Sequence, residues 1–157
     1  QTPVAVICAG AKSILDIGLT LEYLETQGVP VLGYQTEDFP AFYTRESGYK
    51  ADYSIESPQL MAKVIADKWN MKLKGGVVIG NPIPKEHELE PAFINKSIEE
   101  ALEKAEASGI KGKKVTPFLL DYLKSATKGD SLAANIELVY NNARVGSQIA
   151  VELAKLD

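Results

Sequence analysis

The sequence predicts an α/β fold in which the strands of a parallel sheet alternate with helices and the C-terminal end is helical. Two observations support this fold class. Short apolar runs rich in β-branched residues alternate with longer segments whose apolar residues recur at helical spacing. The runs lack a polar face, which is typical of strands covered on both sides, as in parallel sheets. These runs are Val4 to Cys8, Val31 to Tyr34 and Val77 to Ile79.

The order of these elements predicts how the first strands are connected. A strand, a helix and a second strand in succession favour two parallel neighbours joined by a right-handed crossover. Ser13 is the predicted N-cap of the connecting helix, and Gly28 followed by Pro30 ends it. Ser57 and Pro58 form the usual start of a second helix, an N-cap followed by proline in the first turn.

The C-terminal part of the chain is predicted to be helical. One helix covers 90–108, a second begins at Thr116 and ends before Gly129, and a last one covers 132–156. The last helix carries its apolar residues at helical spacing, so we expect one buried side. That predicted side contains Leu132, Ile136, Val139, Tyr140, Ala143, Ile149, Ala150 and Leu153.

Composition indicates a globular protein. The 157 residues are 45% hydrophobic, and a chain of this length buries roughly 70% of the surface that it exposes when unfolded. The net charge is −4 with no basic stripe, so neither nucleic acid nor a membrane surface is an expected partner. The single cysteine, Cys8, cannot form an internal disulfide and fits a reducing compartment. Because the first residues do not resemble a signal peptide, we expect a cytoplasmic location.

The candidate catalytic residue is Lys12, which follows the first predicted strand after Ala9, Gly10 and Ala11. Ligands of open α/β sheets lie outside the carboxyl ends of the strands, and these small residues are expected to let a substrate approach the backbone. A lysine amine can form an imine with a carbonyl only when neutral, which requires its pKa to fall several units below about 10.4. A surface lysine or a phosphate contact is the alternative interpretation.

Two asparagines are candidate substrate-binding residues. Asn81 follows Gly80 at a second strand end with small residues, where it would bind a substrate hydroxyl or cap the turn. Asn135 lies near the start of the last helix, and from the residues alone a bond to a neighbouring loop is the alternative. The chain has one histidine, His87, in an acidic loop. One histidine cannot form a metal site, so no metal ligand is predicted within this chain.

A loop after the second predicted strand contains three aromatic residues and an arginine, namely Phe39, Phe42, Tyr43 and Arg45. Three interpretations are open. In the first, the residues form a wall of the substrate site. In the second, the aromatic residues anchor the loop on the core while Arg45 pairs with an acid such as Glu46. In the third, the loop is part of a subunit contact, where aromatic residues and arginine are enriched.

Short motifs occur in order along almost the whole chain: VICAGAKSILD at 6–16, GYQT at 33–36, FPAF at 39–42, NPIP at 81–84 and TPFLL at 116–120. In order and approximate spacing, they resemble the pseudouridine-5′-phosphate glycosidase family, also called indigoidine synthase A-like proteins. Ser131, Asn135 and the segment 141–143 continue this likeness near the C-terminus.

The resemblance implies that residues 1–157 are the C-terminal portion of a single α/β glycosidase domain whose N-terminal half is absent from this chain. It implies reversible cleavage of the carbon–carbon glycosidic bond of pseudouridine 5′-phosphate to uracil and ribose 5-phosphate. In that reaction Lys12 forms an imine with the opened sugar, and Asn135 contacts the substrate near the lysine. The family also implies a homotrimer.

The resemblance places several groups upstream of Gln1. These are the acid that protonates the leaving base, the segment that binds the phosphate and the aspartate that ligates a manganese ion. This chain alone is therefore expected to be catalytically incomplete, with the N-terminal half of the same protein as a partner. Two alternatives stay open: another Schiff-base lyase of phosphosugars, similar to an aldolase, and a non-catalytic fragment that serves assembly.

Overall fold

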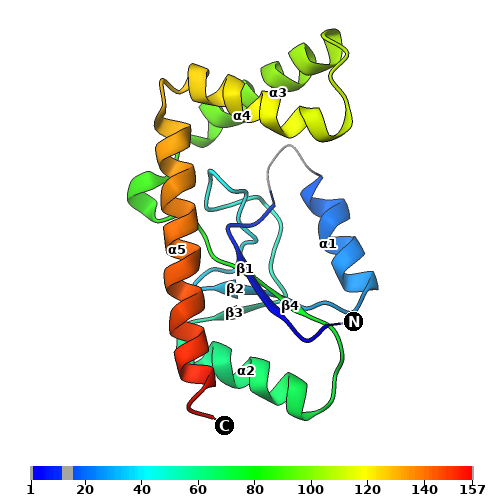
Figure 1. The fold of residues 1–157 in the computed structure, drawn as a ribbon, viewed down its shortest axis with the longest axis vertical. Helices are drawn as coiled ribbons and strands as arrows, with labels where there is room; N and C mark the ends of the chain where they lie inside the picture. Colours follow the sequence, from blue (N-terminus) through cyan, green and yellow to red (C-terminus); the bar gives the residue numbers. More distant parts are fainter. Residues whose placement is uncertain (1, 12–15, 157) are drawn as a thin grey trace.

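The computed structural model describes residues 2–11 and 16–156, and within them it shows a four-stranded parallel sheet with helices on both faces (Figure 1). The order across the sheet is β1-β4-β2-β3, and every pairing is parallel. The predicted α/β fold class is therefore confirmed. The strands are β1 (Ala5–Cys8), β2 (Val31–Tyr34), β3 (Tyr53–Ile55) and β4 (Val77–Gly80).

The helices largely follow the predicted boundaries. In the described residues they are α1 (Ile17–Thr26), α2 (Pro58–Asn70), α3 (Pro91–Ala107), α4 (Val115–Ala126) and α5 (Asp130–Leu153), with short 3₁₀ helices at Lys85–His87 and Gly112–Lys114. Ser57 caps α2 as predicted, because its hydroxyl accepts a hydrogen bond from the Leu60 amide at 3.2 Å. The carboxylate of Asp16 caps α1, whereas the predicted cap Ser13 lies outside the described residues.

The predicted adjacency of the first two strands is wrong. β4 lies between β1 and β2, with Ile79 opposite Ile7 on one side and Leu32 on the other. Three of the four residues of β4 are fully buried, which suits a central strand. The sequence pattern also missed β3, whose Tyr53 and Ser54 are polar or exposed as expected of an edge strand.

Strand β1 is less buried than predicted, because it forms an edge of this sheet. Val4 and Val6 keep 45% and 47% of their surface exposed, while Ala5 and Ile7 pack toward the core. An apolar run indicates a strand. The run does not specify whether another strand pairs with each edge of that strand, or whether a helix covers each of its faces.

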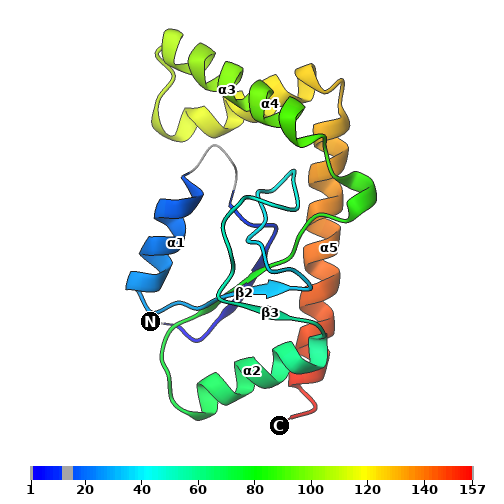
Figure 2. The same ribbon diagram turned by 180° about the vertical axis from the view of Figure 1, so that it is seen from behind.

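Each face of the sheet has its own hydrophobic core (Figures 1 and 2). On one face, α2 and α5 pack against side chains such as Leu32 and Ile79. On the opposite face, α1 packs through Ile17 and Leu21 against Val31. A third cluster joins α3, α4 and the first turns of α5 beyond the end of the sheet. In the described residues no helix combines the length and apolarity needed to cross a bilayer.

The buried side of α5 differs from the predicted one. Leu132, Ile136, Val139 and Tyr140 are exposed. The predicted Ile149 is buried, and the helix otherwise packs through Ala134, Leu138, Asn141 and Val145. Apolar residues occupy two sides of this helix, so periodicity identifies two candidate faces. Only the position of the sheet and of the α3–α4 pair selects the one that is buried.

Candidate functional site

Strands β1 and β4 end side by side at the carboxyl edge of the sheet. Cys8 is aligned with Gly80, and the Asn81 amide donates a hydrogen bond to the Cys8 carbonyl at 2.8 Å. The prediction that the two strand ends with small residues open at the same edge is confirmed. This edge is where parallel α/β sheets bind ligands.

The small residues after β1 make room for a loop of the protein itself. Gly10 has a φ of +84°, and a Cβ built on it would lie 1.6 Å from the Pro40 carbonyl oxygen. The Phe42 amide donates to the Ala9 carbonyl at 3.0 Å. The expectation that a substrate approaches the backbone here is therefore wrong for Gly10, because Pro40 occupies that space. Lys12, the predicted nucleophile, lies outside the described residues.

The aromatic loop is anchored on the core, as one of the three interpretations predicted. Phe39 and Tyr43 keep only 2% and 4% of their surface exposed. Tyr43 belongs to the same buried cluster as Ala9, and the ring of Phe42 meets it edge to face. These contacts hold the loop against the end of β1. A role of the loop in a subunit contact stays a prediction.

One cavity at this edge contains Asn135, and we call it the Asn135 cavity. It has a volume of about 300 Å³. Its lining is mainly apolar and consists of Tyr43, Pro117, Leu120, Asp121, Lys124, Ser131, Leu132 and Asn135. Burial raises the pKa of the Tyr43 phenol, and a hydrogen bond with Ser131 lowers it in part. Through Tyr43, the cavity adjoins the end of β1, after which the chain continues to Lys12.

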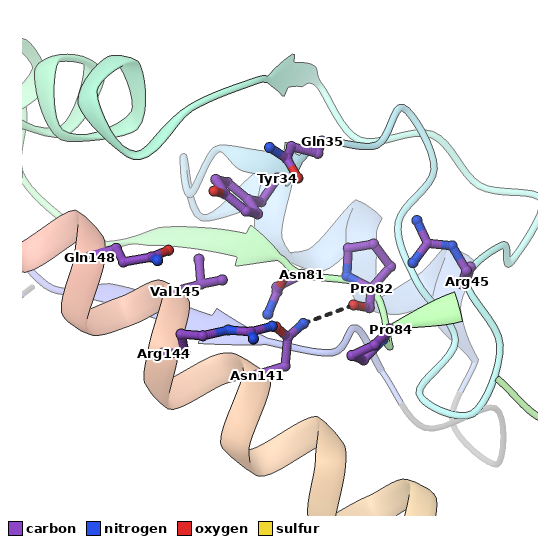
Figure 3. Close-up of a pocket in the computed structure, with 10 residues that line it drawn as sticks. All are labelled: Tyr34, Gln35, Arg45, Asn81, Pro82, Pro84, Asn141, Arg144, Val145 and Gln148. Atoms are coloured by element: carbon purple, nitrogen blue, oxygen red, sulfur yellow. Dashed lines mark hydrogen bonds between the residues drawn. The ribbon is translucent and has the colours of Figure 1, made fainter. Parts of the chain in front are cut away.

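A second cavity lies where β2 and β4 end beside the middle of α5, and we call it the arginine cavity (Figure 3). It has a volume of about 370 Å³. Its lining is mainly polar and consists of Tyr34, Gln35, Arg45, Asn81, Pro82, Pro84, Asn141, Arg144, Val145 and Gln148. Arg45 and Arg144 are the only arginines in the sequence.

Hydrogen bonds from α5 hold the segment after β4 in place. The buried Asn141 side chain donates to the Pro82 carbonyl at 3.2 Å, drawn as a dashed line in Figure 3. The Asn81 side chain donates to the Asn142 side-chain oxygen at 2.9 Å. Asparagine inside a helix costs several tenths of a kcal/mol relative to alanine. Both bonds offset this cost and give the two mid-helix asparagines a structural role.

The two predicted substrate-binding asparagines do not share a cavity. Asn135 lines the Asn135 cavity, whereas Asn81 lines the arginine cavity and keeps only 3% of its surface exposed. The predicted pairing of Arg45 with an acid is wrong, because none of the ion pairs among the described residues includes Arg45. Its guanidinium donates to the Ile83 carbonyl at 2.5 Å, and only its backbone amide meets an acid, the Glu88 carboxylate, at 2.7 Å. Sequence reasoning also missed Arg144 as a site residue. The signal that could have found it is that Arg45 and Arg144 are the only two arginines in the sequence.

The structure offers no metal site within the residues that it describes. No three of their histidine, cysteine, aspartate and glutamate side chains are grouped so that they could hold a metal ion. Nε2 of His87 lies 3.8 Å from a carboxylate oxygen of Glu137. The manganese ion implied by the family resemblance therefore finds no ligand set among these residues.

Comparison with known proteins explains the order of motifs along the chain. A family model described as indigoidine synthase A like protein matches residues 1–152. The chain belongs to this family. It is 60% identical over its whole length to the pseudouridine-5′-phosphate glycosidase of Clostridium botulinum, of which it covers 51%. It is 63% identical over 99% of its length to the enzyme of the same name from Caldanaerobacter subterraneus, again covering 51% of that protein.

Two solved structures share this fold. The prealnumycin C-glycosynthase AlnA, crystallised in complex with ribulose 5-phosphate, is 34% identical with a TM-score of 0.88. An indigoidine synthase A-like protein from Thermotoga maritima is 37% identical with a TM-score of 0.83. Each comparison covers 97% of this chain and 50% of the other chain. The chain thus spans about half the length of the curated and solved relatives described here.

Proposed function

We propose that the full-length protein is a pseudouridine-5′-phosphate glycosidase and that this chain supplies its imine-forming lysine, Lys12. The observation that carries the proposal is the high identity to glycosidases of that name along the entire chain. The complex of AlnA with ribulose 5-phosphate adds support, because that protein binds a pentose phosphate on the same fold. The proposed location is the cytoplasm, and the proposed assembly is a homotrimer.

The chemistry explains why a lysine is needed. In pseudouridine 5′-phosphate a carbon atom is the leaving group, so the usual pair of carboxylates is not sufficient. Ring opening breaks the C1′–O4′ bond: Nζ of Lys12 takes the place of O4′ on C1′, and O4′ takes up a proton to become a hydroxyl. The nitrogen lone pair then forms the C=N bond as the C1′–C5 bond breaks. C5 of uracil takes up a proton. Water then adds to the imine carbon, which releases ribose 5-phosphate and restores the free amine.

The described chain leaves β1 at the carboxyl edge of the sheet, four positions before Lys12 in the sequence. The packing of Pro40 against Gly10 orders the chain directly after β1, and the Asn135 cavity adjoins this point through Tyr43 and the Ala9 cluster. We propose that Asn135 contacts the substrate beside the imine. Asn81 is the second proposed substrate contact, with its side-chain oxygen available after its amide group has bonded Asn142.

The remaining catalytic groups are proposed to come from the N-terminal half of the protein. These are the proton donor, the segment that binds the substrate phosphate and the manganese ligand. Manganese, where bound, would supply a positive charge that orders water around the substrate. No step described here depends on it, because the described residues do not form a metal site.

Borohydride trapping tests the proposal. The full-length protein is incubated with ribose 5-phosphate and sodium borohydride, digested and examined by peptide mass spectrometry. We expect the mass of the reduced sugar phosphate on the peptide that contains Lys12. The matched control is the variant Lys50→Ala, which should form the same adduct on the Lys12 peptide. Lys50 is an exposed lysine that pairs with Asp38 and lines neither of the two cavities.

Two other results would identify the alternatives. An adduct on Lys12 without release of uracil from pseudouridine 5′-phosphate indicates a different Schiff-base lyase of phosphosugars. No adduct on any lysine contradicts imine chemistry and leaves a non-catalytic assembly role.

A further inference from the structure

The arginine cavity concentrates positive charge in an acidic protein. The chain has a net charge of −4 and 17 basic residues, of which only Arg45 and Arg144 are arginines. These two residues are 99 positions apart in the sequence, yet they line the same cavity. Among the described residues that line it, none is acidic. The fold therefore brings together two guanidinium groups without a compensating carboxylate in the lining.

Both guanidinium groups are held by neutral oxygen atoms. Arg45 donates to the Ile83 carbonyl at 2.5 Å, and Arg144 donates to the side-chain oxygen of Asn141 at 2.6 Å. Neither arginine takes part in the ion pairs found among the described residues. A guanidinium has five N–H donors, so each keeps most of its donors for another partner. These anchors orient the groups. The Glu88 carboxylate accepts from the backbone amide of Arg45 at 2.7 Å and forms no ion pair with its guanidinium.

The rest of the lining adds neutral hydrogen-bonding groups. Gln35 follows the end of β2, and Gln148 lies one turn after Arg144 on α5 (Figure 3). The volume of about 370 Å³ suits a small metabolite, since ligand cavities begin at about 300 Å³.

We propose that the arginine cavity binds a small phosphorylated molecule at a site separate from the imine centre. A phosphate monoester carries a charge between about −1.5 and −2 at neutral pH, which matches two arginines. Arginine is the preferred residue for phosphate because its planar group donates two parallel hydrogen bonds. The side-chain amides of Gln35 and Gln148 would bind the polar remainder of the molecule. The inference depends on the arginine cavity alone and does not require the proposed glycosidase activity.

A titration with inorganic phosphate tests this site. The full-length protein is first reacted with ribose 5-phosphate and borohydride, so that the imine centre is covalently occupied. Phosphate is then titrated by calorimetry at constant ionic strength, because salt screens such interactions. We expect one phosphate ion to bind. Arg144→Gln should weaken this binding about 10- to 100-fold, because a charge-assisted hydrogen bond is lost.

Three variants sharpen the result. Lys63→Gln removes the same charge from an exposed position of α2 away from the cavity, and we expect unchanged phosphate binding. Arg144→Lys keeps the charge but not the planar group, so an intermediate affinity is expected. Arg45→Gln is a second test from the opposite wall, and its thermal melting curve is recorded because Arg45 also bonds the Ile83 carbonyl.

Two results would overturn the inference. Equal phosphate binding by the wild type, Arg144→Gln and Lys63→Gln, or no binding at all, excludes a phosphate site in this cavity. Loss of the sugar adduct on Lys12 in Arg144→Gln shows that the arginine holds the phosphate of the substrate itself. If the wild type forms no adduct, the proposed function fails, and the titration of untreated protein still tests the arginine cavity.

Discussion

Two cavities flank the same helix, α5, and differ in chemistry. The Asn135 cavity, near the start of the helix, is mostly apolar, and its one acid and one lysine balance each other. The arginine cavity, two turns further along, has two arginines, four amide side chains and no acid among its described lining residues. The comparison shows that one sheet edge provides a weakly polar environment beside the end of β1 and a positively charged environment beside the ends of β2 and β4.

The largest expected effect tests the imine chemistry proposed for the end of β1. Lys12→Ala in the full-length protein should lower the rate of uracil release from pseudouridine 5′-phosphate by about 10⁴-fold or more, because the nucleophile is lost. Uracil release is measured by chromatography. Circular dichroism checks that the variant is folded. A rate within tenfold of the wild type would contradict the assignment of Lys12.

The next prediction concerns the part of α5 that connects the two cavities. Leu138 keeps 2% of its surface exposed, so Leu138→Ala should lower the free energy of unfolding by about 2–5 kcal/mol. The matched control is Val139→Ala on the neighbouring residue, which is 61% exposed and should change stability by less than about 0.5 kcal/mol. Both are measured by urea denaturation. Equal effects would show that the two sides of α5 are similarly covered in the full-length protein.

A smaller effect is expected at the Asn135 cavity. Asn135→Ala should lower kcat/KM for pseudouridine 5′-phosphate by about 10- to 100-fold, because a hydrogen bond to the substrate is lost while the nucleophile remains. Ser147→Ala is the control, since Ser147 is an exposed residue of α5 outside both cavities. An unchanged kcat/KM in the Asn135 variant would assign this asparagine to the structural role that the sequence left open.

The smallest effect concerns Cys8, the last residue of β1. Burial raises the pKa of its thiol above the ordinary value of 9.0, although a hydrogen bond from Gly10 opposes the shift. Less thiolate is therefore present at pH 8 in the folded protein, and iodoacetamide should alkylate Cys8 more slowly there than in urea. Alkylation is followed by mass spectrometry.

The same shift has a consequence for stability. The folded state holds the thiol proton more tightly than the unfolded state, so the free energy of unfolding should decrease as the pH rises above 9.0. Cys8→Ala should lack this contribution. Equal alkylation rates in folded and unfolded protein would show that the end of β1 is open to solvent.

Much of the fold was predictable because it depends on local pattern. The runs at β1, β2 and β4 and the cap at Ser57 follow from residue type and spacing. The position of β4 between β1 and β2 was not predictable, because an apolar run does not specify its neighbours. Tyr140 on α5 was predicted to be buried but is exposed. The reason is the same, because the hydrophobicity of a residue does not specify whether another element packs against it.

The candidate site divides in a similar way. The motif around Lys12 and the position of Asn135 were recognisable from the order of residues along the chain, and the family match confirms the resemblance. The arginine cavity was not recognisable. Arg45 and Arg144 come from a loop and from the middle of a helix, and nothing in their local sequence indicates that they share a cavity.

The sequence by itself determined the fold class, the family and the helix and strand segments other than β3, because these depend on the type and spacing of nearby residues. Only the tertiary structure decided which strands are neighbours, that Pro40 fills the space at Gly10, and that the two asparagines lie in different cavities. Such contacts join residues that are distant in the chain. They arise from close packing of the whole molecule, which no single segment specifies.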